Sequence, residues 1–186
     1  MQPEIYRQAV HLILFVLVFF LAEFNRGQMA FLLLLLLLVT VLLVPRFGLG
    51  HYFYRPSDRR YSVGAISYFV SLLILVLFFS DPAVIAAWAA LALGDGLATI
   101  LGQKFNRPKL WWNASHSLVG SAAFMVATFL GSGWALFWLV PGLGSSQILT
   151  IATVASLVGA VVESLPLKIN DNISVPLAVA LVVMWL

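Results

Sequence analysis

The stretch MAFLLLLLLLVTVLLV, residues 29–44, carries no charged side chain and no glycine or proline. No heptad pattern of charges accompanies its leucines, so it predicts a lipid-facing helix and not a coiled coil. The whole chain shares this character, with 62% hydrophobic residues, 9% charged residues and a mean hydropathy of +1.04. A soluble domain has about 25% charged residues. Lipid is therefore expected to surround most of the folded chain.

Segments of this kind predict a single integral-membrane domain, residues 1–186, folded as an all-α polytopic bundle of about seven spans. The expected spans are 9–23, 29–44, 63–79, 83–101, 116–130, 147–162 and 173–186. No small-x-small cleavage pattern follows the first span, so it is expected to be retained and not removed as a signal peptide. The piece from Trp134 to Val140 either extends the fifth span or lies at the membrane interface, and Pro176 is expected in the first turn of the last helix.

Charge is distributed unevenly between the two sides of such a bundle. With seven spans, nine of the ten basic residues share one side, which the positive-inside rule makes cytoplasmic. Acids contribute little to membrane orientation, yet five of the seven acids and all three histidines (His11, His51, His116) lie on or near this side. We therefore expect a functional site there. The basic residues are Arg7, Arg46, Arg55, Arg59, Arg60, Lys104, Arg107, Lys109 and Lys168, and the acids are Glu4, Asp58, Asp95, Glu163 and Asp171.

Asp95 is the strongest single indication of chemistry. It lies inside an apolar span, in Leu93-Gly94-Asp95-Gly96. A carboxylate at membrane depth costs about 2.5 kcal/mol or more, so it normally faces a protein interior or a wet cavity. Its flanking glycines let backbone or ligand approach closely. The alternative is a polar contact that only holds two helices together.

A second acidic group follows near the C-terminus, where Glu163 closes one span and Asp171-Asn172 opens the next. Asp171 and Asn172 could simply cap the last helix. Together with Asp95, however, they supply the hard oxygen ligands that Mg²⁺ prefers. The absence of cysteine rules out thiolate ligands, thiolate nucleophiles and disulfides.

Cations and hydroxyl groups follow Asp95, in Gly102-Gln103-Lys104-Phe105-Asn106-Arg107-Pro108-Lys109 and Ser115-His116-Ser117-Leu118-Val119-Gly120-Ser121. Such a set is suited to binding a polyphosphate, although membrane-topology anchoring also explains the cations. The glycine–lysine spacing of a Walker A loop is absent.

The N-terminal residues Glu4, Arg7 and His11 share one helix face at the cytoplasmic end of the first span. An interfacial helical turn would also explain them. Arg59-Arg60 is expected to anchor lipid headgroups, and His51, among aromatic residues, to lie in an interfacial belt.

Taken in order, these elements resemble the CTP-dependent lipid-alcohol kinases, the family of dolichol kinase, phytol kinase and fungal-type diacylglycerol kinase. The resemblance spans nearly the whole chain. This sequence departs from the family pattern at His116, where lysine is usual, at Val119, where an acid is common, and at Gln8, where a second basic residue is usual. The motifs are Glu4-x-x-Arg7-x-x-x-His11, Gly64-Ala65, Gly94-Asp95 with Gly102, Ser117-Leu118-x-Gly120-Ser121, and Glu163 with Asp171-Asn172-x-x-x-Pro176.

The resemblance implies transfer of the γ-phosphate of CTP to the hydroxyl of a membrane isoprenoid alcohol of the dolichol, polyprenol or phytol type, with Mg²⁺, at the cytoplasmic face. Asp95 and Asp171 would bind the metal, and Glu163 or Asp95 would accept the hydroxyl proton. Supporting residues would be Glu4, Arg7, His11, Arg59 and Arg60. The nucleotide-binding residues would be Lys104, Arg107, Lys109, His116, Ser117, Gly120 and Asn172.

Four other functions compete with this interpretation: a CTP-dependent diacylglycerol kinase, a CTP:lipid-phosphate cytidylyltransferase, a membrane transporter or channel, and a lipid-binding scaffold. A transporter predicts polar residues near the bilayer midplane, whereas here they gather at one end. No nucleic-acid partner is expected. The sequence leaves open which alcohol is used and what the oligomeric state is.

Overall fold

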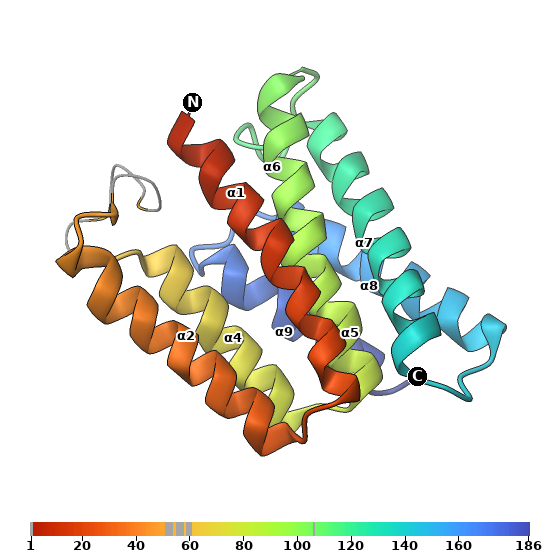
Figure 1. Ribbon diagram of the computed structural model, residues 1–186. Coiled ribbons are helices and arrows are strands. Elements are labelled where there is room, and N and C mark those ends of the chain that lie inside the picture. The colour runs from red at the N-terminus through yellow and green to blue at the C-terminus, as the bar shows by residue number, and fades with distance from the viewer. Residues whose placement is uncertain (1, 51–53, 55–57, 59–60, 106) are drawn as a thin grey trace.

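The computed structural model describes residues 2–50, 54, 58, 61–105 and 107–186, with the backbone alone at 2–4. In these residues the chain forms seven helical segments and no β-strand, which confirms the predicted all-α bundle (Figure 1). The predicted Arg59, Arg60 and His51 and the side chain of Glu4 lie outside the described residues. The elements are α1 (Gln2–Leu14) continuing into η1 (Phe15–Ala22), α2 (Arg26–Arg46), α4 (Val63–Phe78), α5 (Asp81–Ala89) continuing through η2 (Ala90–Gly94) into α6 (Asp95–Lys104), α7 (Leu118–Leu139), α8 (Ser145–Ser164) and α9 (Asp171–Val183).

By length and composition, five helices can cross a membrane: Ile5–Ala22, Arg26–Arg46, Asp81–Lys104, Leu118–Leu139 and Ser145–Ser164. The apolar helices Val63–Phe78 and Asp171–Val183 are shorter. Polar caps set several of the boundaries. Asn25 and Gln28 form a capping box at the start of α2, and the Ser62, Ser117 and Asn170 side chains accept from backbone N–H groups of α4, α7 and α9.

Two details of the expected helix boundaries are resolved by the fold. The piece that follows Gly133 extends the fifth span, because α7 continues to Leu139. Pro176 was expected in the first turn of the last helix, and this is wrong. Asn170 caps α9 two residues earlier than expected, so Pro176 lies in the helix interior and is buried. The polar residues before the apolar run form the first turn, which apolar patterning alone does not reveal.

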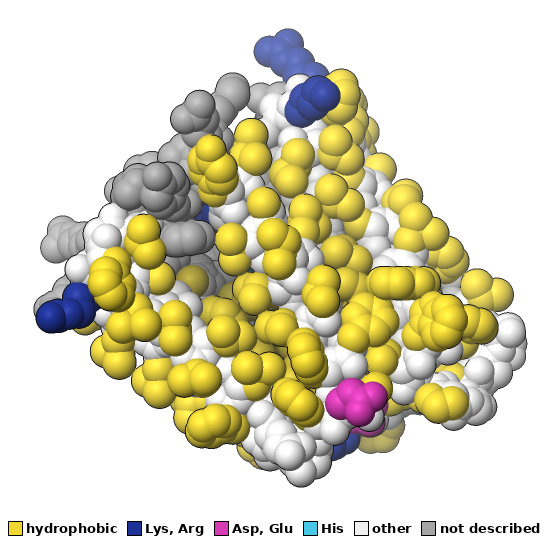
Figure 2. Space-filling model, in the orientation of Figure 1, with side chains coloured by type: hydrophobic (Ala, Val, Ile, Leu, Met, Phe, Trp, Pro, Cys, Tyr) yellow, Lys and Arg dark blue, Asp and Glu magenta, His cyan; other side chains and the backbone are white. Residues whose placement is uncertain are grey.

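The continuous segment from Asp81 to Lys104 is the centre of the bundle. In its most apolar stretch, 67% of the residues are buried inside the bundle. The corresponding share for α2 is 11%, so α2 presents most of its surface outward. Small alanines between Ala83 and Ala92 are fully buried and let α7, α9, α4 and α8 pack closely against this segment. In Figure 2 hydrophobic side chains cover most of the face formed by α1, α2 and the central segment.

The ends of the helices alternate between two sides, as predicted. Figure 1 shows the start of α1 and the α6–α7 connection at the upper end, with the turns from η1 to α2 and from α4 to α5 at the lower end. The ion pair between Arg26 and Asp81, 3.2 Å long and exposed, joins two of the lower connections. The residues of the candidate functional site, described below, lie at the upper end, where the central segment leaves the core.

Candidate functional site

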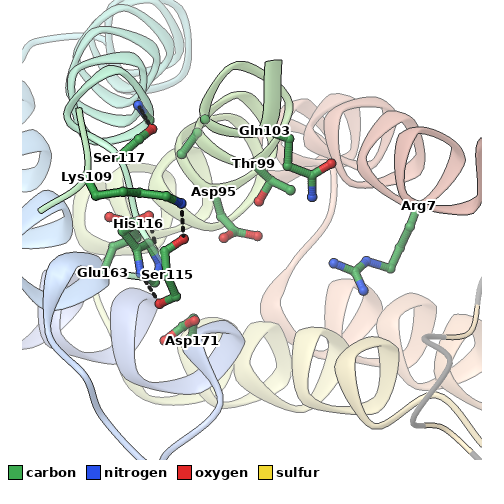
Figure 3. Close-up of a pocket in the computed structure, with 13 residues that line it drawn as sticks. Arg7, Asp95, Thr99, Gln103, Lys109, Ser115, His116, Ser117, Glu163 and Asp171 are labelled. Carbon is green, nitrogen blue, oxygen red and sulfur yellow. Dashed lines mark hydrogen bonds and ion pairs between the residues drawn. The ribbon is translucent and has the colours of Figure 1, made fainter. Parts of the chain in front are cut away.

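A polar cavity of about 550 Å³ opens at this upper end of the bundle (Figure 3). Side chains reach it from α1, α6, the α6–α7 loop, α8 and α9, so residues far apart in the sequence meet there. Its lining residues are Arg7, Asp95, Ala98, Thr99, Gly102, Gln103, Lys109, Ser115, His116, Ser117, Gly120, Glu163 and Asp171.

Asp95 lies where the central segment changes from a π-helix to an α-helix. Residues Ala90–Gly94 form a short π-helix, and the Asp95 backbone N–H donates to the carbonyl of Ala90, five residues earlier. Such π-turns occur frequently at functional sites because they re-aim the following side chain. Gly94 makes the turn possible next to α7, since a Cβ there would overlap the Phe124 and Thr128 side chains. The Asp95 carboxylate points into the cavity (Figure 3).

Asp171 is the first residue of α9, and its carboxylate faces the same cavity as that of Asp95 (Figure 3). The cap of this helix is Asn170, whose side chain accepts from the N–H of Asn172. Asn172 is buried, and its side-chain amide donates to the Gly64 carbonyl over 2.7 Å. Ser71 of α4 donates to the Asn172 carbonyl over 2.6 Å. These bonds lock α9 to α4 and thereby fix the position of Asp171.

Glu163, near the end of α8, forms a buried polar group with the loop. Its Oε1 lies 3.3 Å from His116 Nε2, and the Ser121 hydroxyl lies 3.5 Å from its Oε2. The Ser115 hydroxyl lies 2.9 Å from His116 Nδ1. The Ser115 hydroxyl donates its one proton to Asn113 Oδ1, so its oxygen is left to accept from the Nδ1–H of His116. A neutral imidazole has one N–H, and it then carries that proton on Nδ1, with Nε2 facing Glu163.

Burial keeps His116 in this neutral form. Removal from water lowers the pKa of the His116 imidazole below its ordinary value of 6.5; the Asp171 charge raises it and the Lys109 charge lowers it further. His116 is therefore mostly neutral at pH 7. At this position the imidazole therefore adds no full positive charge to the cavity.

The loop that carries Lys109 and His116 is tied to the end of α8. Trp112 Nε1 and Asn113 Nδ2 each donate to the Ser164 carbonyl over 3.1 Å. Lys109 pairs with Ser117 in an isolated bridge, which brings its side chain to the cavity rim. Trp112 and Asn113 were not among the predicted site residues. A buried asparagine in a loop leaves no periodic pattern in the sequence, so no signal there points to Asn113.

Helices α6 and α7 approach each other closely beside the cavity. A Cβ on Gly120 would lie 3.1 Å from the Ala98 carbonyl and 3.4 Å from the Gly102 Cα. These are backbone atoms, so only glycine allows this spacing without a shift. The close approach places the N-terminal turn of α7 in the cavity wall, capped by Ser117, whose hydroxyl accepts from the Gly120 N–H over 3.1 Å. Helix N-termini favour anions such as phosphate.

Most of the predicted site residues meet in this cavity, and some do not. Lys104 and Arg107 are exposed and do not line it; the Lys104 ammonium lies 5.4 Å from the centre of the Phe105 ring. Asn172 contacts α4 as described above. His11 is buried against Tyr68, with ring centres 4.6 Å apart. The predicted residues that line the cavity are Arg7, Asp95, Lys109, His116, Ser117, Gly120, Glu163 and Asp171.

The donor set suits a metal ion that shares its ligands with a substrate. Among the described residues, no group of three or more His, Cys, Asp and Glu side chains is arranged to hold a metal ion. Asp95 and Asp171 supply two carboxylates to one cavity. Mg²⁺ is usually held by one or two carboxylates together with substrate phosphates, not by an all-protein cage. The two carboxylates therefore fit Mg²⁺ that takes its remaining ligands from phosphate oxygens or water.

Comparison with known proteins finds chloroplast isoprenoid-alcohol kinases. The chain is 39% identical over 127 residues to a probable phytol kinase from Triticum aestivum, covering 64% of this chain and 42% of that one. It is 37% identical to phytol kinase 1 of Arabidopsis thaliana, covering 63% and 41%, and 33% identical to the farnesol kinase of the same plant, covering 68% and 44%. These relatives confirm the resemblance to the polyprenol and phytol kinase family. The chain spans less than half the length of the relatives it matches. No family model and no solved structure matches.

Proposed function

From its relationship to the phytol and farnesol kinases, we propose that this protein phosphorylates a membrane isoprenoid alcohol of the phytol or farnesol type. The phosphoryl donor would be a nucleoside triphosphate, CTP by the family resemblance, with Mg²⁺. The observation that carries the proposal is the polar cavity at one end of an apolar bundle, which gathers three carboxylates and two cations. By the charge distribution, this end would face the cytoplasm.

The position of the cavity suits a reaction between a soluble and a lipid-dissolved substrate. A nucleotide enters from water, whereas the alcohol stays in the bilayer, so the two can meet only near the interface. Asp95 lies at the point where the buried central segment turns into α6. Phosphoryl transfer depends mainly on positioning and on neutralising charge. The cavity supplies charged side chains that can neutralise charge and hydrogen-bonding groups that can position the substrates.

The cationic and hydrogen-bonding groups would bind the triphosphate. Arg7 reaches the cavity from α1 and Lys109 from the loop (Figure 3). The N-terminal turn of α7, with Ser117 and Gly120, would bind phosphate oxygens through backbone N–H groups. Lys104 and Arg107 would steer the nucleotide from their exposed positions, and Asn172 would act by holding Asp171 in place.

Asp95 and Asp171 would hold Mg²⁺, which when bound supplies charge neutralisation at the phosphate oxygens. Glu163 would accept the proton of the alcohol hydroxyl. Its contact with His116 favours this assignment over Asp95, because the unprotonated Nε2 of the neutral imidazole can accept the proton that Glu163 takes from the alcohol.

The proposal is tested by following label from the γ-phosphate. Purified protein in lipid nanodiscs is incubated with each of the four nucleoside triphosphates, Mg²⁺, and phytol, farnesol, geranylgeraniol, dolichol or diacylglycerol. Labelled phytyl or farnesyl phosphate, formed best with CTP, is the expected product. Label in diacylglycerol alone, or release of pyrophosphate instead of CDP, would contradict the assignment.

Replacing Lys109 with alanine is expected to raise the nucleotide KM by about 10- to 100-fold. A hydrogen bond to a charged group contributes about 1.5–3 kcal/mol, and each 1.4 kcal/mol corresponds to a factor of ten. Lys104→Ala removes the same charge from an exposed site outside the cavity, and we expect less than about a threefold change. Equal effects of both substitutions on the nucleotide KM would show that general charge, and not the cavity, binds the nucleotide.

A further inference from the structure

A second cavity, of about 250 Å³, lies between α1, α2 and α4, and its lining is almost entirely apolar. Val10 and Leu14 of α1 face Leu36 and Val39 of α2 across it, and Phe69 of α4 contributes to its wall. Figure 1 shows α1 and α2 diverging toward the upper end of the bundle, with α4 close to α2.

Arg7 connects this apolar cavity to the polar one, because it lines both. In Figure 3 its guanidinium group lies across the polar cavity from Asp95 and Asp171. One α1 side chain therefore separates the candidate site of phosphoryl transfer from an apolar space within the bundle. A molecule with a polar head and an apolar chain could occupy both sides of Arg7 at once.

Few polar groups face the apolar cavity. His11 is packed on the Tyr68 ring, and the Tyr68 hydroxyl accepts from Trp88 Nε1 at 3.3 Å. The Tyr54 hydroxyl is buried, and no hydrogen-bond partner for it lies among the described residues. Predominantly apolar walls with a few placed polar groups are typical of sites for small lipophilic ligands.

The size of the cavity limits what it can enclose. Pockets that bury a whole drug-sized ligand are roughly 300–1,000 Å³, so this one would hold only the part of a long chain nearest its head. Val39, in its wall, is 38% exposed on the outer surface of α2, where the surface is apolar. The rest of a chain can therefore continue outward into lipid.

We propose that the apolar cavity between α1, α2 and α4 binds the part of the alcohol's isoprenoid chain that lies nearest its hydroxyl. The hydroxyl itself would extend past Arg7 into the polar cavity. This rests on the proposed kinase function for the identity of the ligand. The chain-binding site, and hence the selectivity among alcohols, would then lie on α1, α2 and α4. The carboxylates Asp95, Glu163 and Asp171 lie on α6, α8 and α9.

The test combines photolabelling with kinetics. The probe is a phytol analogue with a diazirine near the hydroxyl end of its chain, applied to wild-type protein in nanodiscs. Label competed by excess phytol is expected on peptides of α1, α2 or α4. Val39→Trp fills the cavity from α2 and is expected to reduce this labelling and to raise the phytol KM by about tenfold or more, with the nucleotide KM unchanged.

Leu38→Trp is the matched control, because Leu38 is exposed on α2 and does not line the cavity. It is expected to label and react as the wild type does. Competed label confined to α7 and α8, or equal effects of the two tryptophans, would overturn the proposal even if the kinase is active. Competed label on α1, α2 or α4 in a protein that phosphorylates no alcohol would support the binding site and reject the kinase function instead.

Discussion

Asp95→Asn is expected to reduce kcat for alcohol phosphorylation by about 10³-fold. The carboxylate would hold the metal that neutralises charge on the transferred phosphoryl group, and this effect contributes several kcal/mol, with about tenfold in rate for each 1.36 kcal/mol. Asparagine keeps the shape of the side chain but loses its charge. The measurement is the initial rate of γ-phosphate transfer at saturating nucleotide, repeated over a range of Mg²⁺ concentrations, because a lost ligand also raises the Mg²⁺ requirement.

Asp81→Asn provides a matched control. Asp81 opens the same continuous helical segment at its opposite end, where it forms an exposed ion pair with Arg26. Exposed pairs contribute about 0–1 kcal/mol, so rate and stability should both stay close to wild type. Full activity of folded Asp95→Asn would exclude Asp95 as a metal ligand. A loss of activity that matches a loss of thermal stability would make it a helix-packing residue instead.

Glu163→Gln is expected to reduce kcat by about 10²- to 10⁴-fold, the range attributed to general acid–base groups. Glutamine can still contact Ser121 and His116, so the buried group should keep its packing. It cannot take a proton from the alcohol. The nucleotide KM should change little, because Glu163 is assigned to the proton of the alcohol and not to the phosphate oxygens.

His116→Ala separates the proton acceptor from its partner. It removes the 3.3 Å contact but leaves the carboxylate, so we expect a kcat between those of wild type and Glu163→Gln. The pH–rate profiles of the three proteins are the readout that packing alone would not change. If Glu163→Gln keeps its kcat, Glu163 is not the proton acceptor.

The sequence by itself predicted the seven helices, because each contains an apolar run and a chain in lipid must satisfy its backbone hydrogen bonds within helices. The same alternation of spans predicted that Asp95, Glu163 and Asp171 lie on one side of the membrane. The apolar run predicted a last span from residue 173, whereas α9 begins at Asp171, after the polar Asn170 cap. Apolar patterning locates a helix but not its polar first turn.

Only the tertiary structure decided which of the residues on that side share a cavity. Lys104 and Lys109 are five positions apart, yet only Lys109 lines it, because Trp112 and Asn113 fold the loop against Ser164. The contact between His116 and Glu163 and the π-turn before Asp95 likewise depend on helix packing. Charge and hydropathy are properties of each residue and can be read along the chain. Contacts between α6, α8 and α9 depend on the distance at which their surfaces pack, and that distance is set by the whole bundle.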